Sequence, residues 1–303
     1  MNAATLKRLA VLLAGLVVIW LGVWLWRAAH RDADRSLRLT RFDPKTADEV
    51  TIARPADTLR FRRKAGAWSV NGHAADGSMV NELLGALSDT SARSELVAET
   101  TASHRRLGLD SATARRVSVL RAGATVTQLL VGKPGDVYGT SLVRKPGDVR
   151  SYDLEGQLAN LVARPQDDWR DKLIVRVPAE SVAAITVRRG TRSYGLKREG
   201  KAWRLGGAPA DSAAVARLLV QLRDLEAAGF PSGAQAESTR FVPGRAVQVS
   251  DSAGRTLADL RMDSLADAVW VRRAGDSVTY RIDAWTADQL APADSVLRAR
   301  KKK

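Results

Sequence analysis

The chain has 303 residues, of which 45% are hydrophobic and 27% charged, so most of it is expected to bury a core in one or two domains. It contains no cysteine, which excludes disulfides, thiolate metal sites and cysteine nucleophiles. The formal net charge is +15, but the excess is concentrated in residues 1–41 and 298–303 rather than in the body. A nucleic-acid-binding protein carries its charge on a folded face, so we expect no nucleic-acid partner.

Residues 9–26 form an uncharged apolar stretch with basic residues at both ends and three tryptophans near its C-terminal end. At about 1.5 Å per residue this stretch would span roughly 27 Å, close to the thickness of a bilayer core. We therefore predict a transmembrane helix over residues 9–26, after a short N-terminal segment, residues 1–8, and before a polar, Arg-rich stalk, residues 27–45. The alternative is a cleaved signal peptide, which Arg27 disfavours because a small residue belongs there.

The direction of this segment depends on two opposed signals. The arginines of residues 27–41 follow the apolar stretch, and on the Lys/Arg count alone the body would stay in the cytoplasm. A short signal-like start before a long translocated domain is nevertheless a common arrangement. We expect a single-pass protein of the inner (cytoplasmic) membrane, with the bulk of the chain extracytoplasmic or periplasmic. The basic C-terminal end fits contact with anionic lipid, or equally a solvated tail.

Two blocks of sequence recur in the same order along the chain. Residues 67–87 recur at 202–222, shifted by 135, and residues 143–154 recur at 271–282, shifted by 128. Two independent matches in one order indicate a tandem duplication.

Each half shows short alternating strands, one amphipathic helix and a closing hairpin. The predicted fold class is α+β: the N-terminal transmembrane helix, then two tandem duplicated domains, each a mainly antiparallel sheet with one principal packed helix. We expect a first repeat over residues 46–165, a junction over 166–178, a second repeat over 179–292 and a basic tail over 293–303.

Trp68 and Trp203 hold equivalent positions, each just before the helix of its half. They fit either a pair of ligand-stacking rings or two core residues, and the core interpretation is favoured because large aromatic side chains dominate burial. Asp76 and Asp211 are expected to be the N-caps of the two helices rather than catalytic acids.

The chain lacks the motifs of the common reaction centres, including a phosphate loop, a dinucleotide-binding glycine pattern, a zinc-protease helix and a serine-nucleophile elbow. Its histidines are His30, His73 and His104, and their spacing favours surface positions over metal binding. Serine–histidine catalysis with His73 or His104 is formally open but has no supporting motif. We expect no catalytic, cofactor-binding or metal-binding residues.

Three carboxylates, Asp167, Asp168 and Asp171, lie around Trp169. A sugar subsite of an envelope hydrolase would place acids beside such an aromatic ring. The favoured interpretation is a polar inter-domain linker, whose tryptophan packs against a domain and whose acids pair with the neighbouring basic residues. The cluster has no evident counterpart in the second half.

Several short motifs together resemble the bacterial domain-of-unknown-function 4340 family. They are a Gly-x-Trp strand end, an Asp-initiated helix with paired leucines, a Leu-Gly-Leu element, a Leu-x-Val-Gly strand end, a Tyr-x-x-x-x-Val-Arg strand and a final tyrosine (Gly66 to Trp68, Asp76 with Leu83 and Leu84, Leu107 to Leu109, Leu129 to Gly132, Tyr138 to Arg144, and Tyr152). The resemblance covers about residues 45–290. The second half is similar to a diverged copy, with Phe241 near the place of the Leu-Gly-Leu element.

The resemblance implies a single-span protein with an accessory role beside a gliding-motility-type ABC transport system, and no catalytic residue can be carried over from it. We therefore expect a non-catalytic accessory or scaffold protein that acts by protein–protein interaction, with ABC transporter subunits as partners. The alternatives are an extracytoplasmic glycan- or polymer-binding protein and, less favoured, an envelope hydrolase.

Overall fold

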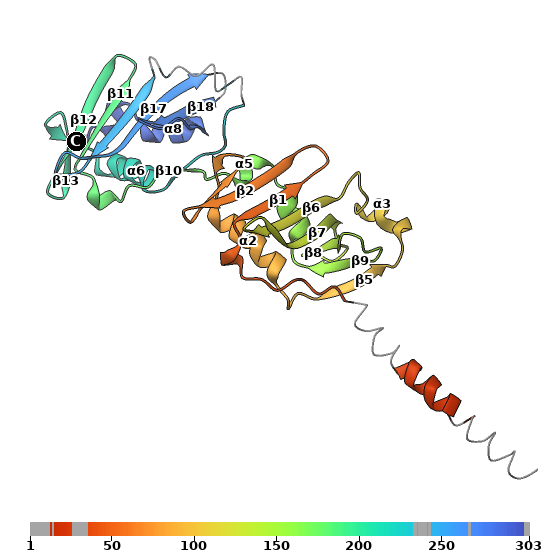
Figure 1. The fold of residues 1–303 in the computed structure, drawn as a ribbon. Coiled ribbons are helices and arrows are strands. Elements are labelled where there is room, and N and C mark those ends of the chain that lie inside the picture. Colours follow the sequence, from red (N-terminus) through yellow and green to blue (C-terminus); the bar gives the residue numbers. More distant parts are fainter. Residues whose placement is uncertain are drawn as a thin grey trace, which may run out of the picture. The chain divides into compact units, whose positions relative to one another are not determined.

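The computed structural model describes residues 13, 15–25, 36–232, 235, 241, 244–265 and 268–299. The chain divides into two compact units, Met1–Arg170 and Asp171–Lys303 (Figure 1). Each unit contains one large antiparallel sheet with helices packed against it, and a small third sheet pairs β10 (Leu173–Val175) with β15 (Leu225–Glu226).

The prediction of a transmembrane helix as the first element of the fold is wrong. The helical residues that the structure describes in that region are 13 and 15–25. Among the residues that the structure describes, no helix is both long and apolar enough to cross a membrane. Residues 9–12, 14 and 26 of the predicted span, like most of the predicted stalk, lie outside the described residues.

The sheet of the first unit has nine strands in the order β4-β3-β2-β1-β6-β7-β8-β9-β5. The strands are β1 (Glu49–Ala53), β2 (Thr58–Lys64), β3 (Ala67–Val70), β4 (His73–Ala74), β5 (Ser94–Ala98), β6 (Arg115–Arg121), β7 (Ala124–Pro134), β8 (Thr140–Arg144) and β9 (Ser151–Glu155). β5 precedes β6 in the chain but pairs with β9, so it forms one edge of the sheet. The pairing of β5 with β9 brings together two segments that are far apart in sequence (Figure 1).

Alternation of apolar residues explains which face of the sheet is covered. In β1, Val50 and Ile52 are fully buried between half-buried neighbours. Successive side chains of a strand point to opposite faces, so such a pattern buries one face against the helices.

Three helices cover this face, namely α2 (Gly77–Ser88), α4 (Leu158–Ala163) and α5 (Gln166–Trp169). The buried residues of α2 recur every three or four positions, which places them on one side of the helix: Val80, Leu83, Leu84 and Leu87.

A smaller apolar cluster lies on the opposite face of the same sheet. It consists of Leu107, Leu109, Leu130 and Leu142, the first of them in the short helix α3 (His104–Leu107). The alternation in β8 separates the two clusters, because Leu142 belongs to the small cluster whereas Val143 belongs to the main core. Two 3-10 turns, η1 (Pro44–Thr46) and η2 (Thr101–Ser103), complete the first unit.

The sheet of the second unit has eight strands in the order β14-β13-β12-β11-β16-β17-β18-β19. The strands are β11 (Ala184–Arg189), β12 (Arg192–Glu199), β13 (Ala202–Leu205), β14 (Ala208–Pro209), β16 (Arg245–Ser250), β17 (Thr256–Leu265), β18 (Ala268–Arg273) and β19 (Thr279–Ile282). The helical segments are η3 (Ala179–Ser181), α6 (Ser212–Arg223), α8 (Ala284–Leu290) and α9 (Asp294–Leu297). The strand order matches the first eight strands of the first unit, and at the place of β5 Gly229 forms only an isolated bridge with Arg281.

The last helix of each unit closes against the start of its principal helix. The Asp76 amide donates to the Trp169 carbonyl at 2.9 Å, and the Asp211 amide donates to the Leu297 carbonyl at 2.8 Å. Residues 169 and 297 differ by the same 128 positions as the repeated sequence block. Residues 166–169 therefore take the place in the first unit that α9 takes in the second.

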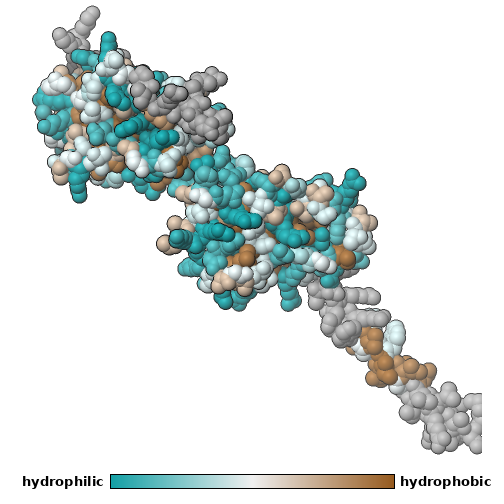
Figure 2. All heavy atoms as spheres, turned by 45° about the horizontal axis from the view of Figure 1, so that its top comes forward, coloured by the Kyte–Doolittle hydropathy of each residue, from teal (hydrophilic) through white to brown (hydrophobic). Residues whose placement is uncertain are grey.

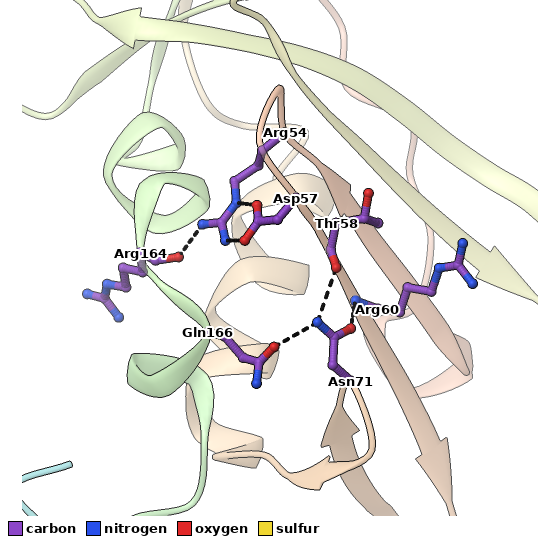
Figure 3. Close-up of polar contacts among 7 residues, drawn as sticks. All are labelled: Arg54, Asp57, Thr58, Arg60, Asn71, Arg164 and Gln166. Atoms are coloured by element: carbon purple, nitrogen blue, oxygen red, sulfur yellow. Dashed lines mark hydrogen bonds and ion pairs between the residues drawn. The ribbon is translucent and has the colours of Figure 1, made fainter. Parts of the chain in front are cut away.

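A polar network joins this closing segment to the hairpin of β1 and β2 (Figure 3). The Arg54 side chain pairs with Asp57 and donates to the Arg164 carbonyl at 2.7 Å. The Asn71 side-chain amide donates to Gln166 Oε1 at 2.8 Å. The end of the first unit is thus held by specific contacts of its own sheet.

Figure 2 shows hydrophilic residues over much of the visible surface of each unit and hydrophobic residues over the described N-terminal helix. Within the two units, the large apolar side chains with the greatest exposure among the described residues are Val97, Val137, Tyr138, Val149, Val220, Trp285 and Val296. Val137 and Tyr138 are the only two residues of this set that are adjacent in sequence, and both lie in the loop between β7 and β8.

Candidate functional site

The carboxylates around Trp169 do not surround an exposed aromatic ring. Trp169 is fully buried, and its ring meets Phe61 edge-on at 5.0 Å between centroids. Asp167 pairs with Arg170 at 3.3 Å, and Asp171 caps the amide of Leu173 at 2.9 Å. A sugar platform needs an open ring face, so this geometry agrees with the packing interpretation. α9 takes the same place in the second unit, but it has Leu297 at the position of Trp169 and Ser295 and Val296 at those of Asp167 and Asp168, so the acidic cluster has no counterpart there.

The paired tryptophans are core residues with a shared second contact. Trp68 and Trp203 are both buried. Arg63 lies over the Trp68 ring at 5.1 Å from its centroid, and Arg198 lies over the Trp203 ring at 5.2 Å. Each arginine covers the outer face of its ring by a cation–π contact, so neither ring is open for stacking with a ligand.

The two predicted helix caps are confirmed. Asp76 accepts hydrogen bonds from the amides of Ser78 and Met79, and Asp211 accepts one from the amide of Ala214 at 2.9 Å. These carboxylates stabilise the first turns of α2 and α6, where amides lack partners within the helix.

The histidines differ in their surroundings. His104 was expected at the surface but is buried, with Nε2 at 2.8 Å from the Val149 carbonyl, so it serves packing. His73 is exposed, and partial desolvation together with the nearby Arg170 lowers its pKa, while Asp167 acts in the opposite direction. His30 lies outside the described residues. Within the described ranges, no group of three or more His, Asp or Glu side chains is arranged to hold a metal ion.

An open groove of about 560 Å³ in the first unit has a different character. We call it the β5–β9 groove, and its lining comes from the start of β5, the loop between β7 and β8, and β9: Arg93, Ser94, Glu95, Val137, Tyr138, Gly139, Thr140, Asp153 and Glu155. It exists because β5 crosses to pair with β9, with Glu95 opposite Asp153.

Hydrogen bonds hold the loop between β7 and β8 in one shape. The Gly135 amide donates to the Thr140 carbonyl at 3.1 Å, and the Thr140 amide and hydroxyl both donate to the Val137 carbonyl, at 3.2 Å and 2.8 Å. The Gly156 amide donates to the Gly139 carbonyl at 2.7 Å, which ties the loop to the end of β9. The loop thereby presents Tyr138 with 93% of its surface exposed.

Gly135 is required by close packing inside this loop. A Cβ at this position would lie 2.1 Å from Thr140 Oγ1 and 2.3 Å from Asp153 Oδ1, so these side chains or the loop would have to shift. The loop therefore rests directly on the Asp153 carboxylate.

The charge of the groove is negative in a chain that is strongly basic. Glu95, Asp153 and Glu155 line it together with one basic side chain, Arg93. Asp153 Oδ1 is buried and has no hydrogen-bond partner within the described part of the chain. Three carboxylates against one guanidinium give the lining a net negative charge, so the groove suits a cationic group.

The second unit lacks this site. Arg281 is the equivalent of Asp153, because each residue directly follows one of the two matched tyrosines. Asp153 pairs with Leu142 on β8, and Arg281 pairs with Trp270 on β18. Arg281 forms a bridge with Gly229, and an added Cβ on that glycine would lie 3.2 Å from its guanidinium. The duplicated position has the opposite charge and a contact with its own chain.

Comparison with family models matches residues 68–241 to the family described as Domain of unknown function (DUF4340). The chain belongs to this family. No curated protein and no solved structure matches the chain.

Every residue that lines the β5–β9 groove lies within the part of the chain that the DUF4340 model covers. Sequence reasoning noticed Tyr138 only as part of a strand motif, and it missed Glu95, Asp153 and Gly135. A glycine that precedes an exposed Val-Tyr pair in a turn was an available signal. The pairing of Glu95 with Asp153 left no signal in the sequence, because it depends on β5 pairing with the distant strand β9.

Proposed function

We propose that this DUF4340 protein acts by protein–protein interaction, as an accessory or scaffold component that holds a basic segment of a partner in the β5–β9 groove. The observation that carries the proposal is the almost complete exposure of Tyr138 on a loop fixed by hydrogen bonds beside a carboxylate-lined groove. Tyrosine is enriched among the residues that dominate binding energies at protein interfaces.

Two further features support a protein partner. The loop is already ordered by backbone contacts, so binding would not have to pay for its immobilisation. The acids at the rim favour a basic partner by electrostatic complementarity, which raises association rates and specificity. The ABC-type transport partner implied by the resemblance, and the extracytoplasmic location, stay predictions.

Quantitative co-purification from cells tests the proposal by comparing two variants, each of which lacks one exposed aromatic side chain. Tyr138→Ala should reduce recovery of the partner by about tenfold or more, the effect expected of a central interface residue. Trp285→Ala is the control, because Trp285 is 63% exposed but lies in the second unit. Equal recovery with both variants would contradict the proposal. Binding of an oligosaccharide in the groove, with no protein partner, would contradict it in favour of the polymer-binding alternative.

A further inference from the structure

The edge strand β5 has one side without a strand partner among the described residues. Its other side pairs with β9, where Glu95 faces Asp153 and Leu96 faces Tyr152. The Glu155 amide donates to the Arg93 carbonyl at 2.8 Å. Because hydrogen-bonding residues alternate in an antiparallel pair, Glu95 directs its amide and carbonyl towards β9, whereas Leu96 directs its own towards the free edge.

A second groove, of about 730 Å³, runs along this free edge. Its lining is Ser36 and the consecutive residues from Ser94 to Glu99. Ser94 and Glu95 line both this groove and the β5–β9 groove. Leu37 donates to the Ser94 hydroxyl at 2.7 Å rather than to the backbone of β5.

The side chains along the edge indicate what would bind there. On the exposed face, Glu95 and Val97 alternate with the inward-facing Leu96, and Glu99 follows the strand. Asp153 adds a carboxylate on the same face as Glu95. An extended segment laid beside β5 would meet an acid, an apolar group and an acid in turn, which calls for Lys or Arg four positions apart with an apolar residue midway between them.

We propose that the basic partner segment joins the sheet of the first unit as an additional strand beside β5, with its Lys or Arg side chains over Glu95 and Asp153. This inference rests on the proposed function and specifies its binding mode. Main-chain hydrogen bonds to the edge would supply affinity, and the acids would select the partner. The second unit offers no equivalent, because only an isolated bridge at Gly229 flanks its β19 edge.

A displayed library of random linear 12-residue peptides, selected on the full chain, provides the probe. Selected peptides should carry Lys or Arg four positions apart, with an apolar residue midway between them, and should bind Glu95→Lys at least tenfold more weakly. Each is then synthesised with N-methyl groups on one or the other set of alternate amides. One methylated set should lower affinity at least tenfold and the other less than twofold, because only every second amide of an added strand faces β5.

Hydrogen exchange on the complex adds a residue-specific readout. Exchange of the Leu96 amide should slow at least tenfold with bound peptide, while that of Glu95, already directed to β9, should change less than twofold. Peptides that bind but tolerate both methylation sets and leave Leu96 unprotected would overturn strand addition and leave the proposed function standing. If no selected peptide distinguishes the wild type from Glu95→Lys and Tyr138→Ala, both proposals are overturned.

Discussion

Asp153 and Arg281 occupy equivalent positions in the two sheets, yet they carry opposite charges. Asp153 faces Leu142 on β8, and Arg281 faces Trp270 on β18. Asp153 leaves one oxygen without a partner in the described part of the chain, whereas Arg281 contacts its own unit at Gly229. The two units thus share the order of eight strands but differ at the place where the first has its groove.

Binding to the groove should depend on salt, since it rests on carboxylates. We expect Glu95→Gln to lower the affinity for a selected basic peptide about threefold to tenfold and to flatten the dependence of affinity on ionic strength, because one attractive charge is lost. Fluorescence anisotropy at several salt concentrations measures both effects. Glu180→Gln, at an exposed acid of the second unit, should change neither. An unchanged salt dependence in Glu95→Gln would contradict the assignment of Glu95 to the site.

Gly135→Ala should destabilise the first unit by about 1–3 kcal/mol, the usual cost of inserting a methyl group into closely packed surroundings. The added Cβ would collide with Thr140 Oγ1 and Asp153 Oδ1, so the loop would have to shift. Denaturant unfolding of the full chain measures the change. Gly85→Ala serves as the control: Gly85 lies inside α2 with nothing within 4 Å, so alanine should stabilise the helix by about 1 kcal/mol. Equal stability of Gly135→Ala and the wild type would show that the loop is not held against Asp153.

Asn71→Ala should destabilise the first unit by about 2 kcal/mol. The Asn71 side chain accepts from the Arg60 amide at 2.9 Å and donates to Thr58 and Gln166, and its backbone has a φ of +46°, which alanine adopts at a cost (Figure 3). Gln166→Ala removes only one of these bonds and should cost about 1 kcal/mol. A larger loss for Gln166→Ala than for Asn71→Ala, measured by thermal unfolding, would contradict the central place of Asn71.

Tyr194 should make the second unit sensitive to alkaline pH. Burial raises the pKa of Tyr194 to about 12, and its hydroxyl donates to the Pro292 carbonyl. The neutral phenol is favoured in the folded state, so its contribution is complete below the pKa of an unfolded tyrosine, about 10, and is lost as the pH rises towards 12. Stability should therefore fall across this window, and less steeply in Tyr194→Phe.

An ultraviolet absorbance titration isolates this group as the difference between the wild type and Tyr194→Phe. The difference should titrate with a pKa near 12. A pKa near 10 would show that the Tyr194 hydroxyl is not buried in solution.

Local features of the fold were predictable because they depend on neighbours in sequence. Asp76 and Asp211 precede runs with helical periodicity, and both cap helices. The closing hairpin predicted for each half is present, formed by β8 and β9 in the first unit and by β18 and β19 in the second. The burial of Trp68 and Trp203 followed from their size and their place at a strand end.

Other features could not be predicted from local patterns. Hydropathy alone predicted a membrane-spanning helix at residues 9–26, whereas no helix among the described residues is both long and apolar enough to cross a membrane. His104 was assigned to the surface because no ligand partner is near it in sequence, while its actual partner is the Val149 carbonyl, 45 positions away.

The sequence by itself determined the repeated plan of this protein, since the matched blocks, the caps and the strand alternation all express interactions over a few residues. Only the tertiary structure decided where function could reside. Loop closure between distant segments placed Glu95 beside Asp153 and set Tyr138 at the rim, and the free energy of such a closure depends on the whole packed sheet rather than on any local pattern.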